Sequence, residues 1–206
     1  MNVIFTCGGT AGHINPALAV AGYIKEKHPD AEISYIGTAD KLEAKLVPEK
    51  GYDFHTINVA GFQRKLSLKN IARNINAVGK AVSSSLDSKK ILKEINPDIV
   101  VGTGGYVSGP VAMASKKMKV PSLIHEQNVY PGMTVKGSAN YVTYLALSFE
   151  ETINHMQHKE KCVVTGNPIR SEILHSDYKK SREKLGIKKP FVLIFGGSLG
   201  ADRIND

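Results

Sequence analysis

Short apolar runs alternate with stretches of helical periodicity along most of this chain. The apolar runs have the length of buried strands, and they fall at residues 3–7, 33–37, 54–59, 98–102, 122–125, 141–148, 162–165 and 191–195. Strands that are separated by helix-length segments pair in parallel through right-handed crossovers. The pattern therefore predicts an α/β protein with a doubly wound, Rossmann-like parallel sheet, whose ligands bind at the carboxyl ends of the strands.

Local signals predict where several of the helices begin. Asn15 and Pro16 have the order of a helix N-cap followed by proline at the first helical position. Asp40 and Glu43 have the spacing of a capping box. Further helices are expected at residues 68–95, with a break near Gly79 or at 83–85, and at residues 109–117.

Three glycine-rich turns follow predicted strands and lead towards helices. They are residues 8–13 (GGTAGH), 102–106 (GTGGY) and 196–200 (GGSLG). Glycine permits positive φ and a close approach of the backbone, and free N–H groups at a helix start attract anions. None has the Gly-Lys-Ser/Thr ending of a P-loop or the spacing of the dinucleotide fingerprint. Three such turns at one sheet edge favour a phosphate or sugar-diphosphate ligand over simple tight turns.

The composition excludes several classes of protein. Of the 206 residues, 42% are hydrophobic and 22% charged, which is the balance of a globular chain and not of a disordered one. The net charge of +8 suggests nucleic acid, an anionic membrane or phosphorylated ligands. The absence of tryptophan and the 7% of aromatic residues offer little surface for stacking bases, so no nucleic-acid partner is expected.

The cysteines and the apolar runs give information on the cellular location of the protein. Cys7 and Cys162 each lie in or after a strand-like run, and buried reduced thiols are favoured over a disulfide. The first residues lack a basic start and a long apolar stretch, so no signal peptide is expected. No run reaches the length of a membrane span. A cytoplasmic location with only peripheral membrane contact is therefore expected.

A domain boundary is expected at residues 165 and 166. Residues 166–168 (GNP) form a turn-rich break after a strand, and a polar stretch at 179–189 precedes a fresh strand. A strand and a turn without a partner cannot bury their apolar surface. Residues 1–165 are thus expected to form one domain, and residues 166–206 a linker and the severed start of a second.

Five motifs, in order along the chain, resemble those of the MurG family, the lipid-linked N-acetylglucosaminyltransferases of peptidoglycan synthesis. They are residues 8–19 (GGTAGHINPALA), 102–110 (GTGGYVSGP), 125–128 (HEQN), 166–170 (GNPIR) and 196–201 (GGSLGA). Two departures are Ala11, where the family usually has glycine, and Met133-Thr134, where it usually has Asn-Lys.

The resemblance implies a glycosyltransferase-B architecture with two α/β domains facing each other across a cleft. The first domain would take lipid I, an undecaprenyl-diphosphate-linked muramyl pentapeptide. The second would hold most of the donor, UDP-N-acetylglucosamine. The sugar would pass with inversion to the 4-hydroxyl of the acceptor to give lipid II, with no cofactor and no essential metal. The present chain alone is expected not to catalyse the transfer.

The resemblance also suggests roles for individual residues. His13 is expected to be the base on the acceptor hydroxyl or to orient that hydroxyl, with a backbone-bonded loop histidine as the alternative. Donor contacts are assigned to Thr10, Ala11, Gly12, Asn128, Arg170 and Ser198, and acceptor contacts to Gly104, Gly105, Tyr106 and Glu126. Asn128 as a turn former and Arg170 as a surface charge are the alternatives. No metal site is expected, because His155 and His158 lack a completing ligand.

A basic region in the middle of the chain suggests how the protein meets the membrane. Phe62, Leu66 and Leu68 are expected to dip into the interface while Arg64, Lys65, Lys69 and Arg73 meet headgroups. The alternative is a helix that packs an apolar face, including Val82, on the sheet and leaves Lys80 in solvent. The protein is then expected on the cytoplasmic face of the bacterial membrane.

Other functions remain open. One is a different glycosyltransferase-B enzyme with a lipid or small-molecule acceptor, against which the HEQN motif argues. Another is a non-catalytic nucleotide-binding module.

Overall fold

Seven parallel strands form one sheet in the computed structural model, which describes residues 1–59 and 68–196 (side chains of 68–78 excepted). The strand order is β3-β2-β1-β4-β5-β6-β7. The strands are β1 (Asn2–Thr6), β2 (Glu32–Gly37), β3 (Asp53–Thr56), β4 (Ile99–Gly102), β5 (Ser122–Glu126), β6 (Tyr144–Leu147) and β7 (Cys162–Val164). This order confirms the predicted doubly wound, Rossmann-like sheet.

The strand order reverses at β1. Thr6, at its end, pairs with Ile36 of β2 on one side and with Gly102 of β4 on the other. The chain leaves β1 and β4 towards helices on opposite faces, and the loops that follow these two strands meet at this point. In open α/β sheets this reversal point is where ligands bind.

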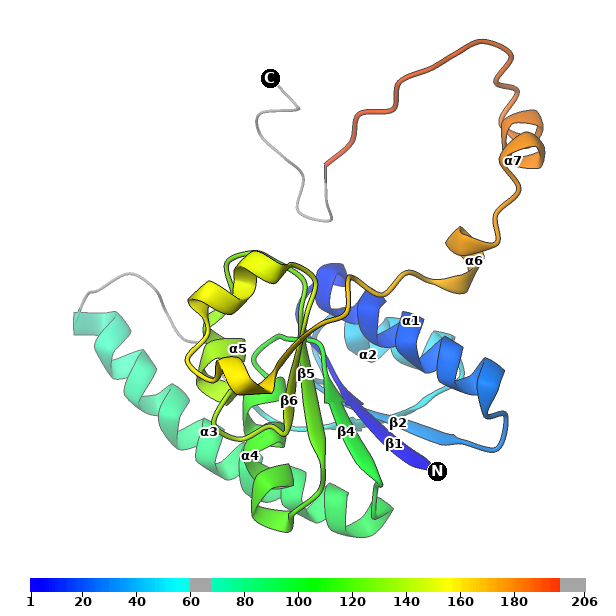
Figure 1. Ribbon diagram of the computed structural model, residues 1–206. Coiled ribbons are helices and arrows are strands. Elements are labelled where there is room, and N and C mark those ends of the chain that lie inside the picture. Colours follow the sequence, from blue (N-terminus) through cyan, green and yellow to red (C-terminus); the bar gives the residue numbers. More distant parts are fainter. Residues whose placement is uncertain (60–67, 197–206) are drawn as a thin grey trace.

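Alternate residues of β1 serve two separate cores. Val3 and Phe5 pack with residues of α1 (Ala11–Lys27) and α2 (Glu43–Glu49) on one face. Ile4 packs on the other face with α3 (Leu68–Ile95) and α4 (Ser108–Met118) (Figure 1). A third core lies under α5 (Met133–Ser138) beside β5 and β6. A strand buried on both faces has no polar alternation, which explains the continuous apolar runs.

Helix α1 begins earlier than its sequence predicts. The N-cap is Thr10, and the N–H groups of His13 and Ile14 both donate to its carbonyl oxygen, at 3.0 and 3.2 Å. The predicted start at Asn15 and Pro16 is therefore wrong, and both residues lie inside the helix. Pro16 is tolerated because it removes only one hydrogen bond near the helix start.

The predicted capping box before α2 is also wrong. Leu42 is the N-cap, and the carboxylate of Asp40 pairs with Lys41 at 2.8 Å instead. Glu43 does not reach back to cap the helix because its side chain is fully buried under the loop after β1. The tertiary partners of Glu43 outcompete the local motif.

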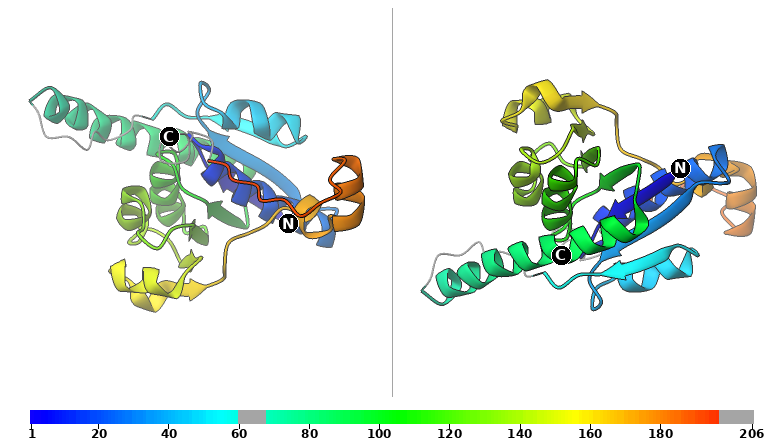
Figure 2. Two further views of the ribbon diagram at one scale, coloured as in Figure 1. Left: turned by 90° about the horizontal axis from the view of Figure 1, so that it is seen from above. Right: turned by 90° about the horizontal axis from the view of Figure 1, so that it is seen from below.

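Helix α3 runs for 28 residues without the expected break. Ser84, Ser85, Ser88 and Leu92 are its buried residues past Lys80, and small serines allow close packing on α4. Val82 is 50% exposed, so the expectation that it packs on the sheet is wrong. The first turns of α3 project beyond the rest of the sheet domain (Figure 2).

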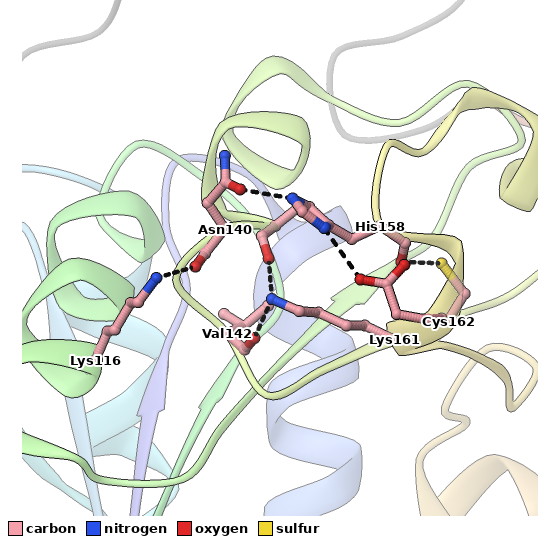
Figure 3. A network of polar contacts seen from close by, with 8 residues as sticks. Lys116, Asn140, Val142, His158, Lys161 and Cys162 are labelled. Carbon is pink, nitrogen blue, oxygen red and sulfur yellow. Dashed lines mark hydrogen bonds and ion pairs between the residues drawn. The ribbon is translucent and has the colours of Figure 1, made fainter.

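The edge strand β7 is tied to the domain by a polar network (Figure 3). Lys161 donates through Nζ to the carbonyl oxygens of Ala139 and Val142, at 2.9 and 3.1 Å. His158 bonds Asn140 and Glu160 from the turn between η1 (Glu150–His155) and η2 (Lys159–Lys161). These contacts hold the chain where it enters β7.

Beyond β7 the chain passes α1 and forms two short helices, α6 (Ser171–Leu174) and α7 (Tyr178–Lys184) (Figure 1). Residues 191–195 form no strand, contrary to the prediction, and their side chains are exposed. In the described part of the chain no strand lies beside them to complete a ladder. The boundary at 165 and 166 stays a prediction.

Candidate functional site

Two glycine-rich loops meet at the reversal point of the sheet. The first (8–13) follows β1, and the second (102–106) follows β4. Gly104 and Gly105 have φ of 106° and 86°, which favours glycine over every other residue. A methyl group on Gly105 would overlap the backbone of Gly8, only 2.9 Å from its nitrogen. The two predicted loops therefore form one packed unit.

His13 occupies the third position of α1 and joins the two loops. Its Nδ1 lies 3.0 Å from the carbonyl oxygen of Gly8. A carbonyl oxygen only accepts, so Nδ1 carries a proton, and in the neutral ring Nε2 then keeps its lone pair. Nε2 faces the second loop, 3.0 Å from where a Cβ on Gly104 would lie. The hydroxyl of Thr103 donates to the backbone oxygen of His13 at 2.6 Å.

Glu43 is a site residue that the sequence did not reveal. Its buried carboxylate accepts from the N–H of Gly9 at 2.9 Å through Oε2. Through Oε1 it accepts from the Thr38 N–H at 3.2 Å and the Thr38 hydroxyl at 2.8 Å. Because 34 residues separate Glu43 from Gly9, no local pattern signals this contact.

Cys7 lies between β1 and the first loop, near the carboxylate of Glu43, and this buried position changes the pKa of its thiol. Cys7 is a free, buried thiol, as predicted. Burial, with a smaller contribution from the charge of Glu43, raises the pKa of its thiol well above the ordinary value. Cys162 is also free but only partly buried.

The loop after β5 carries two more of the predicted residues. The buried carboxylate of Glu126 accepts through Oε1 from both the backbone and the side-chain amide of Asn128, each at 2.9 Å. Through Oε2 it accepts from the N–H of Gly132 at 2.9 Å. Glu126 thus shapes its own loop and holds Asn128, whose side chain is exposed. The donor role of Asn128 and the acceptor role of Glu126 stay predictions.

His125 and Gln127, from the HEQN motif, link the loop after β5 to the chain beyond β7 and to the second loop. His125 Nε2 donates to the carbonyl oxygen of Gly166 at 2.9 Å, and its Nδ1 lies 3.1 Å from Gln127 Nε2. Gln127 Nε2 also donates to the carbonyl oxygen of Thr103 at 2.9 Å, which ties this loop to the second loop. Burial lowers the pKa of His125, against smaller opposing effects of Gly166 and Glu126. Sequence reasoning gave neither residue a role.

The remaining predicted residues lie in different places. Thr10, Ala11 and Gly12 open α1 beside His13, and Tyr106 is 53% exposed on the second loop. Arg170 lies instead along the side of α1, where Leu18 and Gly22 line the same hollow. Its donor role stays a prediction, and Ser198 lies outside the described residues.

A cavity of about 660 Å³ opens beyond β2 and β3, on the same edge of the sheet. Its lining includes Thr38, Asn58 and Lys80. Thr38 also binds Glu43, so the wall of this cavity and the first loop share one carboxylate. The cavity provides space beside the loops on the β3 side.

The predicted membrane residues can be placed only in part. Phe62, Arg64, Lys65 and Leu66 lie outside the described residues, as do the side chains of Leu68, Lys69 and Arg73 in α3. Farther along α3, Val82 and Leu86 are exposed apolar residues. Within the described ranges, no helix is long and apolar enough to cross a bilayer.

No metal cluster appears in the part of the chain that the structure describes, where no three His, Cys, Asp or Glu side chains gather. His155 packs against Tyr130 in a tilted arrangement, with ring centroids 4.7 Å apart. His158 bonds Asn140 and Glu160. The two histidines therefore serve separate packing contacts.

Comparison with known proteins places this geometry in a family. Residues 3–147 match the model of the glycosyltransferase family 28 N-terminal domain. The chain belongs to glycosyltransferase family 28. The matched span covers the sheet from β1 to β6, so both glycine loops, His13, Glu43 and the HEQN motif lie within the family domain.

The relatives of this family 28 chain are also similar over its whole length. A protein of Acetivibrio thermocellus named UDP-N-acetylglucosamine--N-acetylmuramyl-(pentapeptide) pyrophosphoryl-undecaprenol N-acetylglucosamine transferase is 49% identical over 100% of the chain and 55% of the relative. A Bacillus cereus protein of the same name, numbered 1, is 45% identical over 100% of the chain and 56% of the relative. The chain thus spans about half the length of these relatives.

Solved structures share the fold of this family 28 chain. The crystal structure of Acinetobacter baumannii MurG superposes with a TM-score of 0.66 at 27% identity, over 83% of this chain and 46% of that one. The UDP-GlcNAc 2-epimerase of Neisseria meningitidis superposes with a TM-score of 0.59 at 18% identity, over 95% of this chain and 56% of that one. The second likeness shows a shared fold.

Proposed function

We propose that this chain forms the acceptor side of an inverting N-acetylglucosaminyltransferase that converts lipid I to lipid II. The donor is UDP-N-acetylglucosamine, and the acceptor is the undecaprenyl-diphosphate-linked muramyl pentapeptide. The names of relatives at 44–49% identity support this substrate pair. Because those relatives are about twice as long, the reaction is proposed for a protein that joins these residues to a second domain.

The observation that carries the proposal is the free Nε2 of His13 at the meeting point of the two loops. In the transfer, Nε2 takes the proton of the acceptor 4-hydroxyl as that oxygen bonds to the anomeric carbon. The bond from that carbon to the diphosphate breaks, and its electron pair leaves on UDP. A group with this role needs an unprotonated nitrogen, and the contact of Nδ1 with Gly8 leaves Nε2 as that nitrogen in the neutral ring.

The start of α1 supports a diphosphate site. The first N–H groups of a helix, here including those of Ala11 and Gly12, have no partner within the helix and carry partial positive charge. Thr10 adds a hydroxyl. A diphosphate that gains charge as the donor bond breaks is stabilised by such groups.

We also place the protein at the cytoplasmic face of the membrane as a peripheral protein. Lys89, Lys90 and Lys93 lie on α3 beside the exposed Leu86 and line a hollow with it. Asp87 lines the same hollow and pairs with Lys90 at 3.4 Å. An apolar side chain beside several lysines suits an interface with anionic headgroups. The residues at 62–73 that the sequence singles out belong to the same region of the chain.

The test is transfer from UDP-N-acetylglucosamine to a soluble lipid I analogue by a protein that carries these residues and a second domain as long as that of the relatives. His13→Ala is expected to lower kcat by about 100-fold or more, the range of lost acid–base catalysis. His28→Ala, at the exposed far end of α1, is the matched control and should stay within about twofold of wild type. Near-normal kcat in His13→Ala, or epimerisation of the donor without transfer, would contradict the proposal.

A further inference from the structure

The Gly8–Gly9 peptide unit is bonded on both of its polar ends. Its N–H, which belongs to Gly9, donates to Glu43 Oε2 at 2.9 Å. Its carbonyl oxygen, which belongs to Gly8, accepts from His13 Nδ1 at 3.0 Å. The carboxylate and the imidazole therefore bind opposite ends of one amide.

The Gly8 end of this peptide packs against Gly105 of the second loop, whereas its Gly9 end is held by the hydrogen bond to Glu43. Gly9 has φ of 88° and open space where a side chain would be, so the backbone here is not fixed by side-chain packing. Gly8 is buried, and a methyl group on it would lie 2.8 Å from Glu43 Oε1. The carboxylate thus sits against the loop and fixes the direction of its N–H.

The direction of the peptide decides the state of the imidazole. While the Gly8 carbonyl points at His13, the ring is held with its proton on Nδ1. A rotated peptide leaves Nδ1 only the hydroxyl of Thr10, 3.5 Å away, which can donate to Nδ1 and select the opposite tautomer. A negative charge on the N–H end also polarises the amide and strengthens the carbonyl as an acceptor.

We propose that Glu43 is a positioning residue that acts through the Gly8–Gly9 peptide to hold His13 in the Nδ1-protonated tautomer. Its carboxylate orients one backbone amide, and that amide orients the ring so that the unprotonated Nε2 faces the second loop. The role for transfer rests on the proposed function of His13, whereas the hold on the tautomer does not. A histidine base with the wrong tautomer loses catalysis by up to about 10⁴-fold in a well-studied case.

The direct test is the ring ¹⁵N spectrum of His13 in the 206-residue chain, recorded at a pH of about 8.5, well above the ordinary imidazole pKa. Nitrogen shifts distinguish the Nδ1–H and Nε2–H tautomers without substrate or turnover. Wild type is expected to show Nδ1–H as the major form. A major Nε2–H form in wild type would overturn the proposal, even if no Glu43 variant folds.

Glu43→Gln is the first variant. The glutamine side chain has one amide oxygen, which can face either Gly9 or Thr38. The backbone N–H of the other residue then meets the NH₂ group, which is also a donor, and the negative charge is lost in either orientation. We expect the minor tautomer to rise several-fold. In the protein with a second domain, kcat should fall by about 10- to 100-fold, as for lost outer partners of catalytic groups, with KM within about twofold. Glu43→Met, which offers only a weak thioether acceptor, should have the larger effect.

Thr38→Val is the matched control, because it removes the hydroxyl contact to Oε1 and leaves the Gly9 contact intact. It should change the tautomer and kcat much less than Glu43→Gln does. Equal losses of kcat in Thr38→Val and Glu43→Gln, or an unchanged tautomer in Glu43→Gln, would reduce Glu43 to a structural residue. If wild type transfers no sugar but shows the Nδ1–H form that Glu43→Gln loses, the proposed function fails and the hold of Glu43 on His13 stands.

Discussion

The loop after β1 and the loop after β5 are each held by a buried glutamate, but the two glutamates differ in their sequence separation from the N–H groups that they bind. Glu126 ends β5 and binds N–H groups only two and six residues ahead in its own loop. Glu43 reaches Gly9 from 34 residues away and from a different helix. The β5 loop is therefore shaped by its own sequence, and the first loop by the assembled sheet.

This difference indicates how each loop responds to substitutions in other parts of the structure. The first loop also depends on Gly105 and Thr103 of the second loop, so a change in any of these neighbours reaches His13. The β5 loop connects outward mainly through Gln127 and His125. The proposed catalytic group thus lies in the loop that is least determined by its own residues.

The largest effect is expected from Gly105→Ala. The new methyl group would overlap the backbone of Gly8, and φ of 86° is strained for alanine. Strain and overpacking together should lower the free energy of unfolding by about 3 kcal/mol or more, measured by urea denaturation. Thiol labelling of the buried Cys7 in the native state should also become faster, because the first loop is forced open.

Gly22→Ala is the control for this substitution. Gly22 lies within α1 with open space around it, so alanine should raise the free energy of unfolding by about 0.5–1 kcal/mol. Faster labelling of Cys7 in Gly22→Ala, or unchanged stability in Gly105→Ala, would refute the close packing of the two loops.

A smaller effect separates the two glutamates. Glu43→Ala removes the acceptor of three donors, which are the N–H and hydroxyl of the buried Thr38 and the N–H of Gly9. It should lower the free energy of unfolding by about 3 kcal/mol. Glu126→Ala leaves amides of the exposed Asn128 and Gly132, which water can reach, and should cost about 1 kcal/mol. Urea midpoints of the two variants measure the difference. The reverse order would contradict the contrast between a remote and a local carboxylate.

The smallest effect is a pH dependence from His125. Its pKa is lowered in the folded protein, so the unfolded chain binds the proton more readily. Its contribution to stability is therefore complete above the unfolded pKa of about 6.5 and is lost as pH falls through the lower folded pKa, by at most about 1.4 kcal/mol per pH unit. Denaturation of wild type and His125→Gln between pH about 7.5 and 5 should show a flatter slope for the variant. An identical slope in both would argue against a neutral His125 bound to Gly166.

Much of the fold follows from the sequence, because continuous apolar runs of strand length separated by helical segments leave little choice but a covered parallel sheet. Predicted strand ends differ from the observed ones by a few residues, as at β6 (Tyr144–Leu147) against 141–148. The run at 191–195 was wrongly predicted as a strand, since a strand exists only beside another. Local cap signals failed at Asp40 and Asn15, where tertiary contacts and the glycine turn decide the helix start.

The sequence by itself determined the sheet, the two glycine loops and the histidine between them, because each depends on residue type at short spacing. Only the tertiary structure decided which groups support them. Strand order brings the ends of β1, β2 and β4 together, and a carboxylate from α2 then finds a peptide in the loop after β1. A hydrogen bond across 34 residues has no period to detect, because it depends on the packing of elements and not on their spacing along the chain.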